Sequence, residues 1–191
     1  MITYAKIIST NGKTSNDMAL SPNTLAFIAL ANEYCQALEN ARESSREDFI
    51  STMLRQLPRI YISASDLTTD PTLAYEYEEP YLESLLEEDY YESIRRSIEN
   101  LMGPDDTYLE VFEDDMKYSD TPIAASVAES LCDIFQVLYN FIGMVKDAPD
   151  EYLDNAVIAV KSEFEGYWSQ FVCNVLRALN HIRYNIRETN D

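Results

Sequence analysis

The residues that decide the fold are 121–145, which read TPIAASVAESLCDIFQVLYNFIGMV. From Ile123 to Val145, apolar residues recur at spacings of four, four, three, four, three and four. This period places them on one side of an α-helix, and its length indicates a helix with a deeply buried face. Thr121-Pro122 is a typical helix start, because the hydroxyl caps the first turn and proline fits the first helical position. The sequence therefore predicts a central helix that begins near Pro122.

Two helices are predicted before residue 66. Ser21-Pro22 repeats the hydroxyl-proline start, and helical turns follow to about Arg42. Ser44 or Ser45 is placed to cap a second helix that begins near Arg46. Glu47 and Asp48 are positioned to complete a capping box.

Proline and glycine predict where two of the helices stop. Pro58 lies inside the second pattern and is expected to kink that helix or end it near Leu57, because proline lacks an N–H and clashes with the preceding turn. A third helix is predicted from about Tyr81 to Met102, and Gly103-Pro104 should end it sharply.

The last helix is predicted to be the longest. It should begin near Asp150, and apolar residues keep a heptad-like pattern from Val157 to Ile186. Gly166 lies within this pattern without breaking its phase. A single helix of about 35 residues would span roughly 50 Å, so it should bend or project past its neighbours.

These patterns predict an all-α protein: one mainly antiparallel bundle of about five helices over residues 21–187, with a long C-terminal helix. Residues 1–20 are expected to form an N-terminal arm or loop, and 63–80 and 104–120 acidic connections; TYLEVF at 107–112 is compatible with a short strand. The presence of only four glycines argues against sandwiches, barrels and phosphate-binding glycine loops. The expected core is Leu25, Ile28, Leu54, Leu57, Ile98, Val127, Leu131, Ile134, Leu138, Val160, Phe164, Phe171, Val175 and Leu179.

Negative charge is concentrated in the middle of the chain. The formal net charge is -20, and residues 66–120 hold eighteen Asp or Glu against three Lys or Arg. The same stretch holds seven of the fourteen tyrosines. Such a surface repels nucleic acid and anionic lipid and attracts cations and basic proteins. We therefore expect no direct nucleic-acid binding and no membrane association.

Cysteine usage and hydropathy predict a cytoplasmic protein. Cys35, Cys132 and Cys173 each fall in an apolar helical pattern. An odd number without a C-x-x-C pair favours buried free thiols over disulfides or zinc ligands. The apolar runs are far shorter than the ~20 residues that a membrane-spanning helix needs, and the N-terminal residues show no extended apolar segment of a signal peptide.

The leading functional hypothesis is a non-enzymatic interaction module without a cofactor. Tyrosine offers rigid amphipathic contact area and is enriched in interfaces. An acidic, tyrosine-rich surface would fit a basic protein, and DNA mimicry is a special case. The competing interpretation is that the rings pack on the bundle and that the charge only solubilises the protein. The candidate partner-binding residues are Tyr75, Tyr77, Tyr90, Tyr91, Glu87, Glu88 and Asp89.

A magnesium-dependent hydrolase of a phosphorylated small molecule is the alternative. The chain has one histidine, so the Glu-x-x-His pairs of di-iron bundles are absent. Carboxylates alone can hold magnesium, and Glu79, Glu83, Glu151 and Asp154 have helical spacings that could place two pairs on facing helices. A solvated acidic helix face explains the same residues more simply. No Gly-x-Ser-x-Gly or similar nucleophile motif is present.

Two segments resemble a known family. Phe27–Glu39 reads FIALANEYCQALE, and the acidic helix that follows reads YYESIRRSIENLMG. Together they resemble a bacterial family of small acidic helical proteins that is classed only as a domain of unknown function. The resemblance covers most of the chain after about residue 20. It implies a cytosolic helical protein and supplies no catalytic residues.

Overall fold

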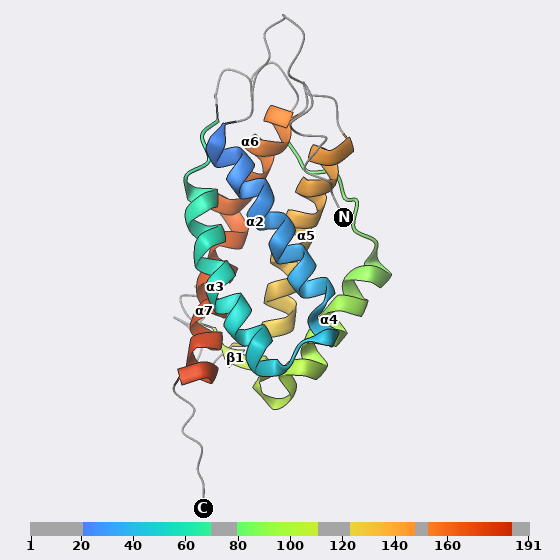
Figure 1. Ribbon diagram of the computed structural model, residues 1–191, viewed down its shortest axis with the longest axis vertical. Helices are drawn as coiled ribbons and strands as arrows, with labels where there is room; N and C mark the ends of the chain where they lie inside the picture. The colour runs from blue at the N-terminus through green and yellow to red at the C-terminus, as the bar shows by residue number, and fades with distance from the viewer. Residues whose placement is uncertain (1–20, 70–79, 111–122, 148–152, 185–191) are drawn as a thin grey trace, which may run out of the picture.

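The computed structural model describes residues 21–69, 80–110, 123–147 and 153–184. In this part of the chain, four helical rods form a ring in which α2 contacts α3 and α5, and α7 contacts the same two helices. In Figure 1, α2 runs downward, α3 and α5 run upward, and α6 with α7 runs downward, so neighbours in the ring are antiparallel. The rods are α2 (Pro22–Glu39), α3 (Arg46–Ser65), α5 (Val127–Asp147) and the continuous series α6 (Leu153–Glu163), η6 (Phe164–Trp168) and α7 (Ser169–Tyr184). The predicted all-α bundle is confirmed.

A fifth helix lies in the long connection between α3 and α5. This helix, α4 (Glu88–Met102), packs mainly against α5 and contacts the short 3-10 turn η1 (Ala41–Glu43). After it come a second 3-10 turn, η3 (Gly103–Asp106), and the strand β1 (Thr107–Leu109), which pairs antiparallel with β2 (Ala124–Ser126). The strand considered at 107–112 thus forms over its first three residues. None of the helices in the described ranges is both long and apolar enough to cross a lipid bilayer.

Hydroxyl caps start the first two helices as predicted. The Ser21 side chain accepts the backbone N–H of Thr24 at 3.1 Å, and the Ser45 side chain accepts that of Asp48 at 3.2 Å. The ends differ from the prediction. The first helix stops at Glu39 and not near Arg42, because a separate 3-10 turn follows it.

Of the two outcomes expected at Pro58, an end of the helix near Leu57 is wrong. The helix α3 continues through Pro58 to Ser65. Leu57, Ile60 and Ala64 are all fully buried on one side of this helix. Their packing stabilises the helical path enough to offset the missing hydrogen bond, whose loss together with the ring clash costs about 3 kcal/mol.

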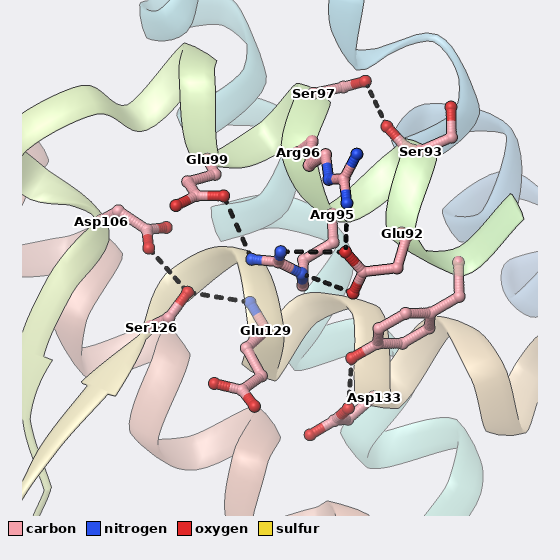
Figure 2. A network of polar contacts seen from close by, with 11 residues as sticks. Glu92, Ser93, Arg95, Arg96, Ser97, Glu99, Asp106, Ser126, Glu129 and Asp133 are labelled. Carbon is pink, nitrogen blue, oxygen red and sulfur yellow. Dashed lines mark hydrogen bonds and ion pairs between the residues drawn. The ribbon is translucent and has the colours of Figure 1, made fainter. Parts of the chain in front are cut away.

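The predicted start of the central helix near Pro122 is also wrong. Residues 124–126 form β2, and α5 begins at Val127. The Ser126 hydroxyl caps the first turn of α5 by accepting the N–H of Glu129 at 3.0 Å, and it donates to Asp106 Oδ2 at 2.6 Å (Figure 2). Asp106 Oδ1 accepts the N–H of Ala128 at 2.8 Å. Asp106, which lies in the connection expected to be acidic at 104–120, is therefore buried.

The C-terminal rod contains one wide turn. Phe164–Trp168 is π-helical, with Gly166 at its centre. A π turn holds one residue more than an α turn, so the helix after it is rotated relative to the predicted phase. Val172 is consequently buried, whereas Phe171, which we expected in the core, is only partly buried.

The core agrees with most of the predicted residues. Leu131, Ile134 and Leu138 of α5 are fully buried and lie at the centre of one contiguous hydrophobic cluster. Leu25 was wrongly assigned, because its side chain is 40% exposed, and Leu54 is only partly buried. Among the cysteines, Cys35 and Cys132 are buried, but Cys173 is exposed, contrary to prediction.

Candidate functional site

The most acidic exposed element in the described part of the chain is the first turn of α4. Its buried residues recur at every fourth position from Ile94 to Met102, so the opposite side of the helix faces solvent. Glu87, Glu88 and Asp89 are all exposed, and their carboxylates form no ion pair or hydrogen bond with another described residue. We call these three residues the acidic turn. Glu88 and Asp89 also lie where the helix dipole favours negative charge.

The second half of α4 is neutralised by its own cations. Arg95 donates to both carboxylate oxygens of Glu92 at 3.0 and 3.1 Å and to Glu99 at 3.1 Å, and Arg96 lies 3.4 Å from Glu92 (Figure 2). The hydrogen bonds from Arg95 lower the pKa of Glu92. Only the acidic turn therefore offers carboxylates of α4 that a partner can engage without breaking an existing pair.

The two adjacent tyrosines of α4 point to different neighbours. The Tyr90 hydroxyl donates to Glu39 of α2 at 3.0 Å, and its ring lies edge-on to Phe135 and Tyr139 of α5. Partial burial, followed by the bond to Glu39, raises the pKa of Tyr90 to about 12. Its ring edge, 39% exposed, remains available for contact.

Tyr91 is tied to α5. Its hydroxyl donates to Asp133 at 2.7 Å, and burial followed by this bond raises its pKa well above the usual range. Burial also raises the pKa of Asp133, while the bond from Tyr91 opposes that shift and the nearby charge of Glu129 adds to it. Tyr91 therefore acts mainly as a structural clamp between α4 and α5.

A second group of carboxyls continues the negative surface beyond α4. Tyr167, which is 51% exposed on the π-helical segment, lies near enough to Asp133, Glu129 and Glu163 for their charges to raise its pKa, although partial burial is the larger cause. The Tyr167 ring lies edge-on to Phe171 at 4.9 Å between centroids. The acidic face therefore extends from α4 across α5 to the π-helical segment.

An extended segment, residues 80–87, positions the acidic turn. We predicted helix from about Tyr81, which is wrong, because the helix begins at Glu88. The side-chain Oδ1 of the buried Asn140 of α5 accepts the N–H of Leu85 at 2.9 Å and that of Leu86 at 3.0 Å. These two bonds satisfy the backbone in an extended path, so helix is not needed there.

The carboxylates proposed for magnesium are placed only in part. Glu83 is exposed in the extended segment and Asp154 lies in the first turn of α6, while Glu79 and Glu151 lie outside the described residues. Within the described ranges, no three His, Cys, Asp or Glu side chains are grouped closely enough to hold a metal ion. Tyr75 and Tyr77 also lie outside these ranges.

Comparison with known proteins assigns a family. A family model described as "Domain of unknown function (DUF5063)" matches residues 18–185. The chain belongs to this family. The crystal structure of protein BF1032 from Bacteroides fragilis is similar to the DUF5063 chain, with a TM-score of 0.75 and 26% sequence identity over 88% of this chain and 96% of that one. No curated protein matches the sequence. The family resemblance drawn from Phe27–Glu39 and the acidic helix is thus confirmed.

Three residues near the acidic turn or on the acidic face of this DUF5063 protein were not predicted from the sequence: Glu129, Asp133 and Tyr81. Glu129 and Asp133 are spaced by four on α5, opposite the strong apolar stripe, and this spacing was the available signal. Tyr81 was not singled out either, yet its side chain is 60% exposed on the extended segment that leads to the acidic turn. Both signals are weak, because helical spacing alone does not show which neighbour covers a residue.

Proposed function

We propose that this DUF5063 protein is a non-enzymatic interaction module that binds a basic protein through the acidic turn of α4. The observation that supports it is the contrast within α4: the acidic turn is exposed and forms no ion pair with any residue of the described ranges, whereas Glu92 and Glu99 are held by Arg95. A basic partner gains new ion pairs at the acidic turn. At Glu92 and Glu99 it would only replace existing ones.

Charge alone is too weak to give a stable complex. Exposed ion pairs contribute about 0.2–1 kcal/mol each, so three of them supply at most about 3 kcal/mol. A micromolar complex needs about 8 kcal/mol. The remainder requires apolar contact, and Tyr81 and Tyr90, which precede and follow the acidic turn in the sequence, are both exposed enough to supply it. We therefore infer that the partner combines basic side chains with apolar ones.

We further propose that binding takes place in the cytoplasm. All three cysteines are free thiols, and two of them are buried. Free thiols persist in reducing compartments. A basic nucleic-acid-binding protein is one class of partner, and in that case the carboxylates would occupy the positions of phosphates.

The test uses a fluorescent peptide of alternating lysine and leucine. A fluorescent peptide of alternating glutamate and leucine is the control with the opposite charge. Anisotropy titrations should show binding of the lysine peptide alone, with an association rate that falls steeply as salt rises, because screening weakens electrostatic steering. The variant Glu87→Gln/Glu88→Gln/Asp89→Asn should bind several-fold more weakly, and Tyr81→Ala should weaken binding with little change in salt dependence.

The control variant removes the same charge elsewhere. Glu47→Gln/Asp48→Asn/Asp66→Asn changes three exposed acids, two in the first turn of α3 and one at its C-cap. Equal losses in the two triple variants would mean that net charge alone drives binding, and the proposal would fail. Capture from lysate at low and high salt, with both variants in parallel, then identifies a natural partner by its dependence on the acidic turn.

Calorimetry with magnesium addresses the hydrolase alternative. We expect the heats to show weak magnesium binding without a defined stoichiometry, and we expect added salt to abolish it. Stoichiometric micromolar binding that is abolished by Glu151→Gln would instead support a metal-dependent hydrolase and count against an interaction module.

A further inference from the structure

An open cleft lies on the surface where α3 packs against α7. Its volume is about 500 Å³, within the range of ~300–1,000 Å³ that small-molecule sites occupy. The described residues that line it are Leu54, Cys173, Leu176, Arg177, Asn180 and Tyr184. Two leucines and a tyrosine ring supply apolar surface, and a few polar groups lie among them, which is the composition typical of ligand sites.

The charge of this cleft is opposite to that of the molecule. Among the described lining residues, Arg177 is the only charged one. Its Nη2 donates to the Leu109 carbonyl of β1 at 2.5 Å, and it forms no ion pair with a carboxylate in the described part of the chain. The carbonyl fixes the guanidinium without neutralising it, and an arginine carries five N–H donors. In a chain of net charge -20, this is a local site for an anion.

A second cleft, between α2 and α3, lacks this property. Its volume is about 330 Å³, and it is lined by both Arg59 and Asp66. Arg59 lies 3.4 Å from the Glu33 carboxylate, so its charge is already matched. An anion gains little there, and this contrast singles out the α3–α7 cleft.

We propose that the α3–α7 cleft binds a small monoanion with an apolar body, such as an aliphatic carboxylate. The carboxylate receives hydrogen bonds from Arg177 and the Asn180 amide, and the chain covers Leu54 and Leu176. A single negative charge is specified because the net charge of the protein repels polyanions. This site is separate from the acidic turn, and its test does not depend on the interaction module.

Cys173 provides a built-in reporter of occupancy. It is exposed and lines the cleft, whereas Cys35 and Cys132 are buried. The rate of Cys173 alkylation by iodoacetamide is measured by mass spectrometry in the presence of decanoate, decanol or decyltrimethylammonium, each below its micelle concentration. Decanoate should slow the alkylation of Cys173 several-fold at saturation, decanol should require a higher concentration, and the cation should give no protection.

Two variants test the roles of charge and position. Arg177→Gln should raise the decanoate concentration for half-protection about tenfold, as expected when a charge-assisted bond is lost. Asn180→Asp keeps the side-chain shape and should abolish protection by placing a second negative charge in the cleft. Arg55→Gln, an exposed cation of α3 that does not line the cleft, should leave protection unchanged.

The proposal is overturned if decanoate gives no protection, or if all three compounds protect equally, since burial of apolar surface would then suffice. It is also overturned if both cleft variants bind decanoate like the wild type. Circular dichroism and the alkylation rates of Cys35 and Cys132 show whether Arg177→Gln unfolds the protein. If it does, the protection of Cys173 by decanoate in Asn180→Asp still decides the proposal.

Discussion

The helices α4 and α5 lie side by side, but they differ in how much of their surface is buried against the rest of the molecule. α5 contacts α2, α4, α6 and α7, and Leu131, Ile134 and Phe135 on it are fully buried. α4 contacts α5 more than any other element and buries only one narrow stripe. We therefore expect changes in α5 to act mainly on stability, and changes on the outer face of α4 to affect stability little and the proposed binding more.

The largest expected effect is in α5. Leu131→Ala should lower the free energy of unfolding by about 2–5 kcal/mol, because it leaves a cavity in the packed core. Leu25→Ala, at a 40% exposed position of α2, serves as the matched control and should cost less than about 1 kcal/mol. Denaturant titration measures both. Equal costs would contradict the burial assigned to these leucines.

An intermediate effect is expected where α5 holds the segment that leads into α4. Asn140→Ala removes the acceptor for the N–H groups of Leu85 and Leu86. Leaving buried donors unpaired should cost about 1–3 kcal/mol. Hydrogen exchange should accelerate at residues 85 and 86 far more than in α5 itself. Uniform acceleration across the bundle would show that the segment is not held independently.

A smaller effect with a defined pH dependence is expected at Asp133, between the two helices. Burial raises its pKa in the folded protein, so the folded state binds the proton more tightly than the unfolded state. Stability should therefore fall as pH rises from about 4 through the folded pKa. Asp133→Asn should be more stable than the wild type at pH 7, and the difference should vanish below about pH 3, where the carboxyl is protonated in both states. A difference independent of pH would contradict this assignment.

The smallest effect on stability is expected at the acidic turn. Converting Glu87, Glu88 and Asp89 to amides relieves repulsion but loses favourable interactions with the helix dipole, each worth about 0.3–1 kcal/mol. The two terms oppose each other, so thermal unfolding should change by only a few degrees. A loss comparable to that of Leu131→Ala would show that the acidic turn is structural, contrary to its assignment as a binding surface.

Local signals predicted the fold well where they acted within one helix. The capping hydroxyls of Ser21 and Ser45 and the stop at Gly103, whose φ of 59° suits glycine, need no distant partner. Prediction failed where distant residues decided the outcome. Asp106, in the connection before α5, accepts the N–H of Ala128, and the buried face of α3 carries the helix through Pro58.

The candidate site was less accessible to sequence analysis than the fold. The density of acidic residues over 66–120 singled out Glu87, Glu88 and Asp89, although their helix was expected to begin near Tyr81 and not at Glu88. The hydroxyl partners of Tyr90 and Tyr91 depend on α4 lying across α2 and α5, and no spacing within α4 reveals that arrangement. The contribution of Asp133 and Tyr167 was missed for the same reason.

The π-helical turn at Phe164–Trp168 has a consequence for how the family can vary in length. Deleting Gly166, which has open space around it, would convert the wide turn to an ordinary one. The deletion would leave the residues from Ser169 to Tyr184 on their present sides of the helix, because the wide turn contains the extra residue and an α-helical turn with one residue fewer covers nearly the same angle. Val172 would stay in the core, and the α3–α7 cleft would keep its lining. Homologues that lack this residue should therefore keep the same apolar pattern in their last helix, shifted by one position, with an ordinary α-helical turn in place of the wide one.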